Sequence, residues 1–403
     1  MGDVGIPEKV PRYEFRSNFF RLCKIYVRDL LFYHLILTDD CNLCCSYCRG
    51  KSFEVYEDSV VEGLKIDPDL PTELSVSLPA LYHFLSQDHE AVLTFYGGEP
   101  LMRSDLIHEI LHNAPVNRYM LQTNGTLLHT IEAADIRKFE TILVSIDGPE
   151  WLTDANRGTG TYRAVVNNLV NIQEIGYPGE IIARMTINEN TDIYDAVSFL
   201  SDNDDFCFSS IHWQIDANFG NDFHTRHFEE WVDHSYNPGI SRLVRHWVEY
   251  MKTNGKAQRW YPFLDPMDDL LKGRQSRLRC GAGYANYSIM TDGSIAACPV
   301  MVGMKDYYLG HIDHSDPGHL PELPVQGRCA ECDILDFCGG RCLYSIITRP
   351  WTVEQNRVLC RTITHLRECL IGALPEVSGL IRNGVVLQNS FLHTKFNGCE
   401  IIP

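Results

Sequence analysis

The sequence lacks long apolar runs, a surplus of positive charge and any low-complexity segment. The apolar run LLFYHLIL at 30–37 is interrupted by His34 and is too short to cross a membrane. Lysine and arginine number 35 against 53 acidic residues, and the net charge of −18 disfavours a nucleic-acid partner, because phosphate binding needs a cationic surface. The opening MGDVGI has neither a hydrophobic signal core nor an acylation motif. We therefore expect a cytoplasmic protein with neither a membrane nor nucleic acid as a partner.

Cysteine, by contrast, is abundant, with 15 in 403 residues. No export signal accompanies them, and in a reducing compartment clustered cysteines more often bind metal or act in redox chemistry than form disulfides. Most of them fall in two groups, at 41–48 and at 280–360. The isolated ones are interpreted as small buried residues: Cys23, Cys207, Cys369 and Cys399.

Short apolar runs alternate with amphipathic helical patterns between residues 31 and 216. The runs are apolar on both faces and end near Gly, Asn or Asp, as buried parallel strands do. They predict strands at 31–37, 91–96, 118–123, 141–146, 180–187 and 209–215. Six β–α units in succession predict an α/β fold whose parallel sheet is either open or part of a barrel. In such sheets the functional groups gather at the carboxyl ends of the strands.

The later part of the chain has a different character. Residues 217–272 are helix- and loop-like, and after Cys280 short strands, glycine-rich turns and cysteines follow, with a hairpin predicted around Asp292-Gly293. We expect five segments: a lead-in at 1–30, an α/β core at 31–235, a helical bridge at 236–272, a smaller metal-bound domain at 273–375 and a tail at 376–403.

Three cysteines with the spacing CxxxCxxC, Cys41, Cys45 and Cys48, directly follow the first predicted strand. Three thiolates on one tight loop can hold three corners of a 4Fe–4S cluster and leave the fourth iron open to a cosubstrate. Zinc is the alternative, but it would need a fourth ligand. Adjacent side chains point apart, so we interpret Cys44 as a packing residue and not as that ligand.

The following strand ends resemble, in order, those of the radical S-adenosylmethionine (SAM) superfamily. The matching motifs are YGGEP at 96–100, QTNG at 122–125, SIDG at 145–148, DANRGTGTY at 154–162 with Asp154 and Arg157, and ARMT at 183–186. One such motif is usually only a turn after a strand, but five in the family's order are far more specific. The resemblance implies a partial (β/α)6 TIM-like barrel. It also implies SAM contacts from Gly97, Gly98, Glu99, Asn124, Ser145, Asp147 and Arg184, the last of these holding the SAM carboxylate.

In that superfamily SAM chelates the open iron, and an electron from the cluster cleaves SAM to methionine and a 5′-deoxyadenosyl radical. The radical then removes a hydrogen atom from the substrate, while the protein positions the partners and excludes water. The resemblance therefore also implies a reductant, such as a ferredoxin or a flavodoxin.

The later cysteines read Cys280-x12-Gly293-x4-Cys298, then Cys329-x2-Cys332-x5-Cys338-x3-Cys342, then Cys360. This frame resembles the SPASM domain of peptide- and protein-modifying radical SAM enzymes, and fits a zinc ribbon poorly. The resemblance implies a distal auxiliary 4Fe–4S cluster on Cys329, Cys332, Cys338 and Cys360. It implies a second auxiliary cluster, nearer the active site, with three corners on Cys280, Cys298 and Cys342. With the SAM-binding cluster, three 4Fe–4S clusters are expected.

The chain departs from the sulfatase-maturing relatives in two ways. No cysteine lies between Cys280 and Cys298, so the near cluster has an open iron or an unidentified ligand. Pro299 stands where those enzymes have a proton-accepting Asp, which weakens formylglycine formation as the activity. The resemblance favours an enzyme that cross-links or oxidises a side chain of a ribosomally made peptide or protein. The alternatives are a sulfatase-maturase-like enzyme and a non-catalytic iron–sulfur carrier.

No catalytic residue is identified from the sequence. Inward residues on the last predicted strand are candidates for substrate contact, although a core role is more common at such positions: His212, Trp213, Gln214 and Asp216. The histidines of HTRH at 224–227 are interpreted as surface residues and not as zinc ligands.

Overall fold

The computed structural model describes residues 30–48, 64–203, 206, 208–216 and 222–397. Cys23, Cys207, Cys399 and almost all of the expected lead-in lie outside these ranges. Within them, no helix is both long enough and apolar enough to cross a membrane.

One sheet of nine strands organises the chain, in the order β6-β5-β4-β3-β2-β1-β7-β8-β9. The strands are β1 Phe32–Ile36, β2 Val92–Tyr96, β3 Arg118–Thr123, β4 Phe139–Ser145, β5 Glu180–Ile187, β6 Ser210–Ile215, β7 Asn286–Ile289, β8 Ser294–Ala296 and β9 Tyr308–His311. The pairs from β6 to β1 are all parallel. The six predicted strands and the partial-barrel α/β fold are therefore confirmed.

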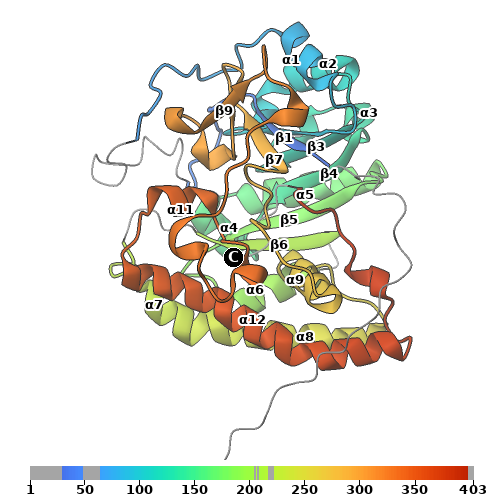
Figure 1. Ribbon diagram of the computed structural model, residues 1–403. Helices are drawn as coiled ribbons and strands as arrows, with labels where there is room; N and C mark the ends of the chain where they lie inside the picture. Colours follow the sequence, from blue (N-terminus) through green and yellow to red (C-terminus); the bar gives the residue numbers. More distant parts are fainter. Residues whose placement is uncertain (1–29, 49–63, 204–205, 207, 217–221, 398–403) are drawn as a thin grey trace, which may run out of the picture.

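The helices of the β–α units pack on the outer face of this sheet (Figure 1). They are α1 Leu78–Leu85, α2 Ser104–Asn113, α3 Ala133–Ile136, α4 Glu150–Arg157, α5 Thr161–Glu174 and α6 Ile193–Ser201. The later helices are α7 Phe228–Trp231, α8 Asn237–Asn254, α9 Tyr261–Lys272, α10 Leu335–Cys338, α11 Leu343–Thr348 and α12 Val353–Arg382. Apolar side chains at three- and four-residue spacing meet the outward residues of the strands in one continuous core.

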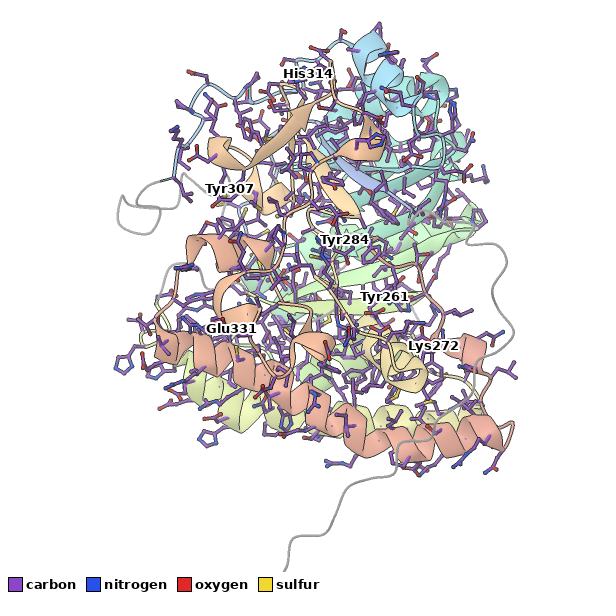
Figure 2. All side chains as sticks on the ribbon, in the orientation of Figure 1. Tyr261, Lys272, Tyr284, Tyr307, His314 and Glu331 are labelled. Carbon is purple, nitrogen blue, oxygen red and sulfur yellow. The ribbon has the colours of Figure 1, made fainter. Side chains whose placement is uncertain are left out.

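The inner face of the barrel has an apolar floor at the amino ends of the strands. Tyr261, at the start of α9 and labelled in Figure 2, belongs there to a buried cluster with inward side chains of five strands: Phe32, Val92, Met120, Leu143 and Ile182. Near the carboxyl terminus, Asn397 Nδ2 donates to the Tyr261 hydroxyl at 2.9 Å. The amino end is thus closed, which leaves the carboxyl end of the barrel for function.

The cysteine-rich region continues the barrel sheet. The predicted hairpin at Asp292-Gly293 is confirmed: β7 and β8 pair antiparallel, and Gly293 has a φ of 94°. The sequence did not indicate that β7 would also pair parallel to β1, with His34 opposite Ser288. The expected domain boundary at 375 falls inside α12, which packs along α8 at one side of the molecule (Figure 1).

Candidate functional site

The CxxxCxxC loop lies at the carboxyl end of β1, and its three thiols are close enough to interact electrostatically. Burial, Cys48 and Cys41 together raise the pKa of the Cys45 thiol to about 11, although Arg157 opposes this. Burial is also the main cause of the raised pKa of Cys41. A raised thiol pKa disfavours the thiolate form unless a cation binds it.

A buried ion pair holds this loop from below. Arg157 of α4 donates from Nε and Nη2 to the two carboxylate oxygens of Asp147, at 3.0 and 2.9 Å. The Tyr47 hydroxyl donates to Asp147 Oδ2 at 2.7 Å, and the Ser46 N–H donates to the Asn156 carbonyl at 2.8 Å. Since the side chains of Asp147 and Arg157 are 0% and 6% exposed, this pair rigidly ties the cysteine loop to β4 and α4.

Asp147 and Asp154, both predicted from sequence, have internal partners. Asp147 Oδ1 also accepts the Thr186 N–H at 3.0 Å, so its carboxylate bonds to four neighbouring residues including Asn156. Asp154 accepts the N–H groups of Gly160 and Tyr162 at 2.7 and 2.8 Å, at the start of α5. The role of Asp147 as a SAM contact stays a prediction, and its observed bonds are positioning bonds.

The GGEP segment joins β2 to the same loop. A Cβ atom added at Gly98 would lie 2.2 Å from the Asp40 carbonyl oxygen, and one added at Gly97 would lie 2.3 Å from that of Thr38. Glycine is therefore required for this close backbone approach. Glu99, which is 0% exposed, accepts the Thr123 hydroxyl and the backbone N–H of Asn124, both at 2.7 Å. Its SAM contact stays a prediction, and its carboxylate is directed into the protein.

Three other predicted SAM contacts lie on the next strand ends. Asn124, after β3, donates from Nδ2 to Asn42 Oδ1 at 2.8 Å, and the same nitrogen lies 3.9 Å from Cys41 Sγ. Ser145 of β4 is half-buried and pairs in register with Arg184 of β5. Arg184 donates from Nη2 to Gln214 Oε1 at 3.1 Å. These side chains share the carboxyl edge of the sheet with the cysteine loop.

Above the apolar floor, the barrel interior is polar. Among the described residues, both ring nitrogens of His212 are buried without a hydrogen-bond partner, as are the hydroxyl oxygens of Thr94 and Ser288. Burial, and secondarily Arg184, hold the pKa of His212 well below its ordinary value. Burial also lowers the pKa of His34 to about 4, despite its Nδ1 contact with Asn286 Oδ1 at 2.8 Å.

Unpaired buried polar groups are costly, so this layer is complementary to a polar bound molecule. The residues present therefore fit a cosubstrate or substrate with several donors and acceptors. His34 and His212 are both neutral at pH 7. Because Nδ1 of His34 contacts Asn286, only the His212 ring offers both a donor and an acceptor nitrogen.

The seven later cysteines separate into two groups in space. Burial raises the pKa of the Cys298 thiol well above its usual range, and Cys342 and Cys280 contribute. Burial also raises the pKa of Cys338 to about 11, with contributions from Cys360 and Cys329. Cys332 in turn interacts with both Cys329 and Cys360. This grouping of three and four is the one that the SPASM resemblance implies.

The distances between the thiol groups can be compared with those that a zinc ion requires. A tetrahedral zinc ion with bonds of about 2.3 Å would hold its sulfur ligands about 3.8 Å apart. In the described part of the chain, which includes all ten candidate ligands, no three cysteine sulfurs lie within 4.8 Å of one another. Three of these thiols would therefore have to move closer together to bind one zinc ion.

Residues 35–200 match the radical SAM superfamily. This segment is a radical SAM domain. Such a domain implies SAM and one 4Fe–4S cluster as cofactors.

Curated relatives of the radical SAM domain have varied functions. A probable GTP 3′,8-cyclase of Methanosarcina mazei is 26% identical over 172 residues, covering 41% of this chain and 49% of the relative. An Fe-coproporphyrin III synthase of Methanosarcina barkeri is 30% identical over 157 residues, 38% of this chain and 36% of the relative. The chain therefore spans less than half the length of these two relatives. The mycofactocin maturase MftC of Mycolicibacterium smegmatis is 24% identical over 336 residues, 76% of each chain.

Solved structures show that the similarity in fold extends beyond the radical SAM domain. The enzyme anSMEcpe with bound AdoMet and a Cp18Cys peptide has a TM-score of 0.63 and 19% identity, covering 87% of this chain and 99% of that one. Streptococcus suis SuiB bound to its precursor peptide SuiA has a TM-score of 0.51 and 15% identity, covering 79% of this chain and 73% of that one. At these identities the likeness establishes the fold alone.

The residues of the last barrel strand that were predicted to contact the substrate point to different faces of the sheet. His212 and Gln214 share the inner face with Arg184. Trp213 points to the opposite face, where its ring packs 5.3 Å from that of Phe263, so the prediction that it faces inward is wrong. Strand alternation explains the difference, since consecutive side chains point to opposite faces.

Asp216 and the two histidines of HTRH follow that strand. Asp216 forms an ion pair with Arg226 at 3.0 Å. His224 and His227 are exposed, as predicted.

Sequence reasoning missed the anchors Tyr47 and Asn156 and the inner polar residues His34, Thr94 and Ser288. Tyr47 could have been suspected, because it is an aromatic residue within the cysteine motif. The other four have ordinary sequence surroundings, and only the barrel register places the inner ones together.

Proposed function

We propose that this protein is a radical SAM enzyme that modifies a side chain of a ribosomally made peptide or protein, by cross-linking, thioether formation or oxidation. The observation that carries the proposal is the position of the CxxxCxxC loop at the carboxyl end of a barrel. In the interior of that barrel, several buried polar groups have no partner among the residues that the structure describes. The seven later cysteines, the length of the MftC alignment and the peptide-bound structural neighbours support a peptide substrate.

In this proposal, each cluster has its own ligand set. Cys41, Cys45 and Cys48 would hold the SAM-binding cluster. Cys280, Cys298 and Cys342 would hold the near auxiliary cluster, and Cys329, Cys332, Cys338 and Cys360 the distal one, within a SPASM domain at about 273–375. When bound, the first cluster and SAM would supply the one-electron chemistry that begins hydrogen-atom abstraction. An external reductant, such as a ferredoxin or a flavodoxin in the cytoplasm, would supply the electron.

The predicted SAM contacts fall into two groups: side chains that could bind SAM directly, and residues that orient the loops around it. Arg184 and Ser145 face the carboxyl edge, where a guanidinium suits a carboxylate and a hydroxyl suits a ribose. Asn124 lies next to the Cys41 thiol. We infer that Glu99 and Asp147 act by orienting the loops around SAM, with Gly97 and Gly98 offering backbone groups. His212 and Gln214 would bind the reacting partners from within the barrel.

Formylglycine formation remains the alternative, because the fold neighbour anSMEcpe was solved with a Cys-containing peptide. Against it, Pro299 follows Cys298 directly, begins a short 3₁₀ turn and offers no proton acceptor. A non-catalytic electron carrier is the third candidate, and it would have no use for an inward-facing polar layer.

One anaerobic experiment separates these functions. The reconstituted protein is incubated with dithionite and SAM, and then also with a Cys-containing peptide of sulfatase type. The proposal predicts 5′-deoxyadenosine without an aldehyde on that peptide. An aldehyde product would support the maturase alternative, and absence of 5′-deoxyadenosine from protein with full iron content would support the carrier.

A further inference from the structure

A separate cluster of potential metal ligands lies on the outside of the barrel. His108 and His112 belong to α2, and Asp135 belongs to α3. His108 Nδ1 lies 2.5 Å from Asp135 Oδ2, and His112 Nε2 lies 2.9 Å from Asp135 Oδ1. One ligand atom from each residue lies within 4.8 Å of the other two. Figure 1 shows α2 and α3 at the end of the molecule opposite α8 and α12.

The local structure presents these groups as a preformed set. Residues four apart on a helix lie on one face, and the two imidazole rings are 4.4 Å apart. Asp135 is 3% exposed, whereas the side chains of His108 and His112 are 53% and 46% exposed. The carboxylate is thus fixed by the fold, and solvent can reach the imidazoles and complete the coordination of an ion.

Asp135 faces three groups that can carry a positive charge. His108 and His112 contact its two carboxylate oxygens. Lys138 Nζ, 3.7 Å from Asp135 Oδ1, is the other cation facing this carboxylate. A bound metal ion would compete with this ammonium group and with the protons on the two histidines.

We propose that His108, His112 and Asp135 form a divalent transition-metal site, best suited to zinc, that links α2 to α3. Two imidazoles and one carboxylate are typical zinc ligands at about 2.0–2.2 Å, and a water would complete a tetrahedron. Tetrahedral ligands at that distance stand about 3.3 Å apart, so small side-chain rotations would admit the ion. Nitrogen and oxygen ligands do not suit a 4Fe–4S cluster, so this site is chemically distinct from the cysteine sites.

The place of the site in the fold argues for a structural role. α2 ends at Asn113 shortly before β3, and α3 ends at Ile136 shortly before β4, so the site lies toward the amino ends of these strands. In (β/α) barrels that end contributes stability, while the chemistry occupies the other end. An ion bound here would stabilise the folded state in proportion to its affinity and concentration.

The test uses full-length protein with its iron–sulfur clusters reconstituted. The protein is dialysed anaerobically against buffered Zn²⁺, and zinc and iron are both measured by mass spectrometry. We expect wild-type protein to hold about one more zinc per chain than the H108A/H112A variant, with equal iron. The matched control, H83A/H129A, removes two exposed histidines elsewhere and should bind zinc like the wild type.

A second variant tests the carboxylate without disturbing the packing. Asp135→Asn keeps the shape and one hydrogen-bond acceptor but removes the charge, and we expect zinc affinity to fall at least about tenfold. Zinc should also raise the melting temperature of the wild type and not that of H108A/H112A. Equal zinc in the wild type and H108A/H112A, or unchanged zinc affinity in Asp135→Asn, would show a hydrogen-bonded cluster without a metal. Neither readout involves SAM, so the outcome is independent of the proposed enzymatic function.

Discussion

The two cysteine-rich regions are built in different ways. In the radical SAM domain, Cys41, Cys45 and Cys48 sit on one loop, and a buried ion pair and close glycine contacts fix that loop from beneath. In the later region the candidate ligands come from separate segments: Cys298 follows β8, Cys338 ends α10, and Cys360 lies in α12. A local loop can leave one side of a cluster open to a cosubstrate. Ligands that converge from several elements enclose a cluster and depend on the whole domain.

The largest effect should come from breaking the local loop. If the three proposed clusters are present, replacing Cys41, Cys45 and Cys48 with Ala should remove about four of roughly twelve irons. It should also abolish 5′-deoxyadenosine formation, because no iron would remain open to SAM. Iron analysis and product chromatography measure both. Cys44→Ala is the control and should keep iron and activity. Unchanged iron in the triple variant would defeat the assignment of this loop.

The next largest effect should come from breaking the buried ion pair that supports the cysteine loop. Asp147→Asn leaves the buried Arg157 guanidinium without its anionic partner, and removing one member of a buried pair costs about 3–5 kcal/mol. We expect a lower melting temperature and loss of the SAM-binding cluster, with the auxiliary clusters kept. Arg163→Met, which breaks the exposed pair with Glu150, should change little. If both variants have the same melting temperature, the buried pair of Asp147 and Arg157 does not support the cysteine loop.

A smaller effect is expected from Arg184→Met, which tests ligand binding apart from cluster binding. Loss of a charge-assisted hydrogen bond of about 1.5–3 kcal/mol should weaken SAM affinity by about ten- to a hundredfold while iron stays constant. Equilibrium binding of SAM and iron analysis on the same sample separate the two. Iron loss in this variant would mean that Arg184 has a structural role.

The smallest effect concerns pH. Because the folded-state pKa of His34 is about 4 and the unfolded value is 6.5, the unfolded state binds more protons between these values. Stability should therefore fall as the pH drops, by about 2 kcal/mol from this residue between pH 7 and pH 5. His34→Leu should flatten that part of the dependence in thermal unfolding. A slope identical to that of the wild type would show that His34 is not buried in the neutral form.

The sequence predicted the six barrel strands because their apolar runs are short, doubly buried and bounded by turn residues. It did not predict that β7 would join the same sheet, since a four-residue strand has too weak a pattern to reveal its partner. It also did not predict the directions of Glu99 and Asp147. A motif names the residue at a strand end, but the neighbouring donors decide where its carboxylate points.

The spacing of the cysteines, the strand pattern and the turn glycines follow from local chemistry, so the sequence alone determined the radical SAM domain and the candidate cluster ligands. Only the tertiary structure decided three other features. They are the inner polar layer of His34, Thr94, His212 and Ser288, the ion pair of Asp147 and Arg157 beneath the cysteine loop, and the contact of α2 with α3 at Asp135. Each of these depends on register and packing between segments distant in the chain, and such long-range contacts leave no periodic trace in the sequence.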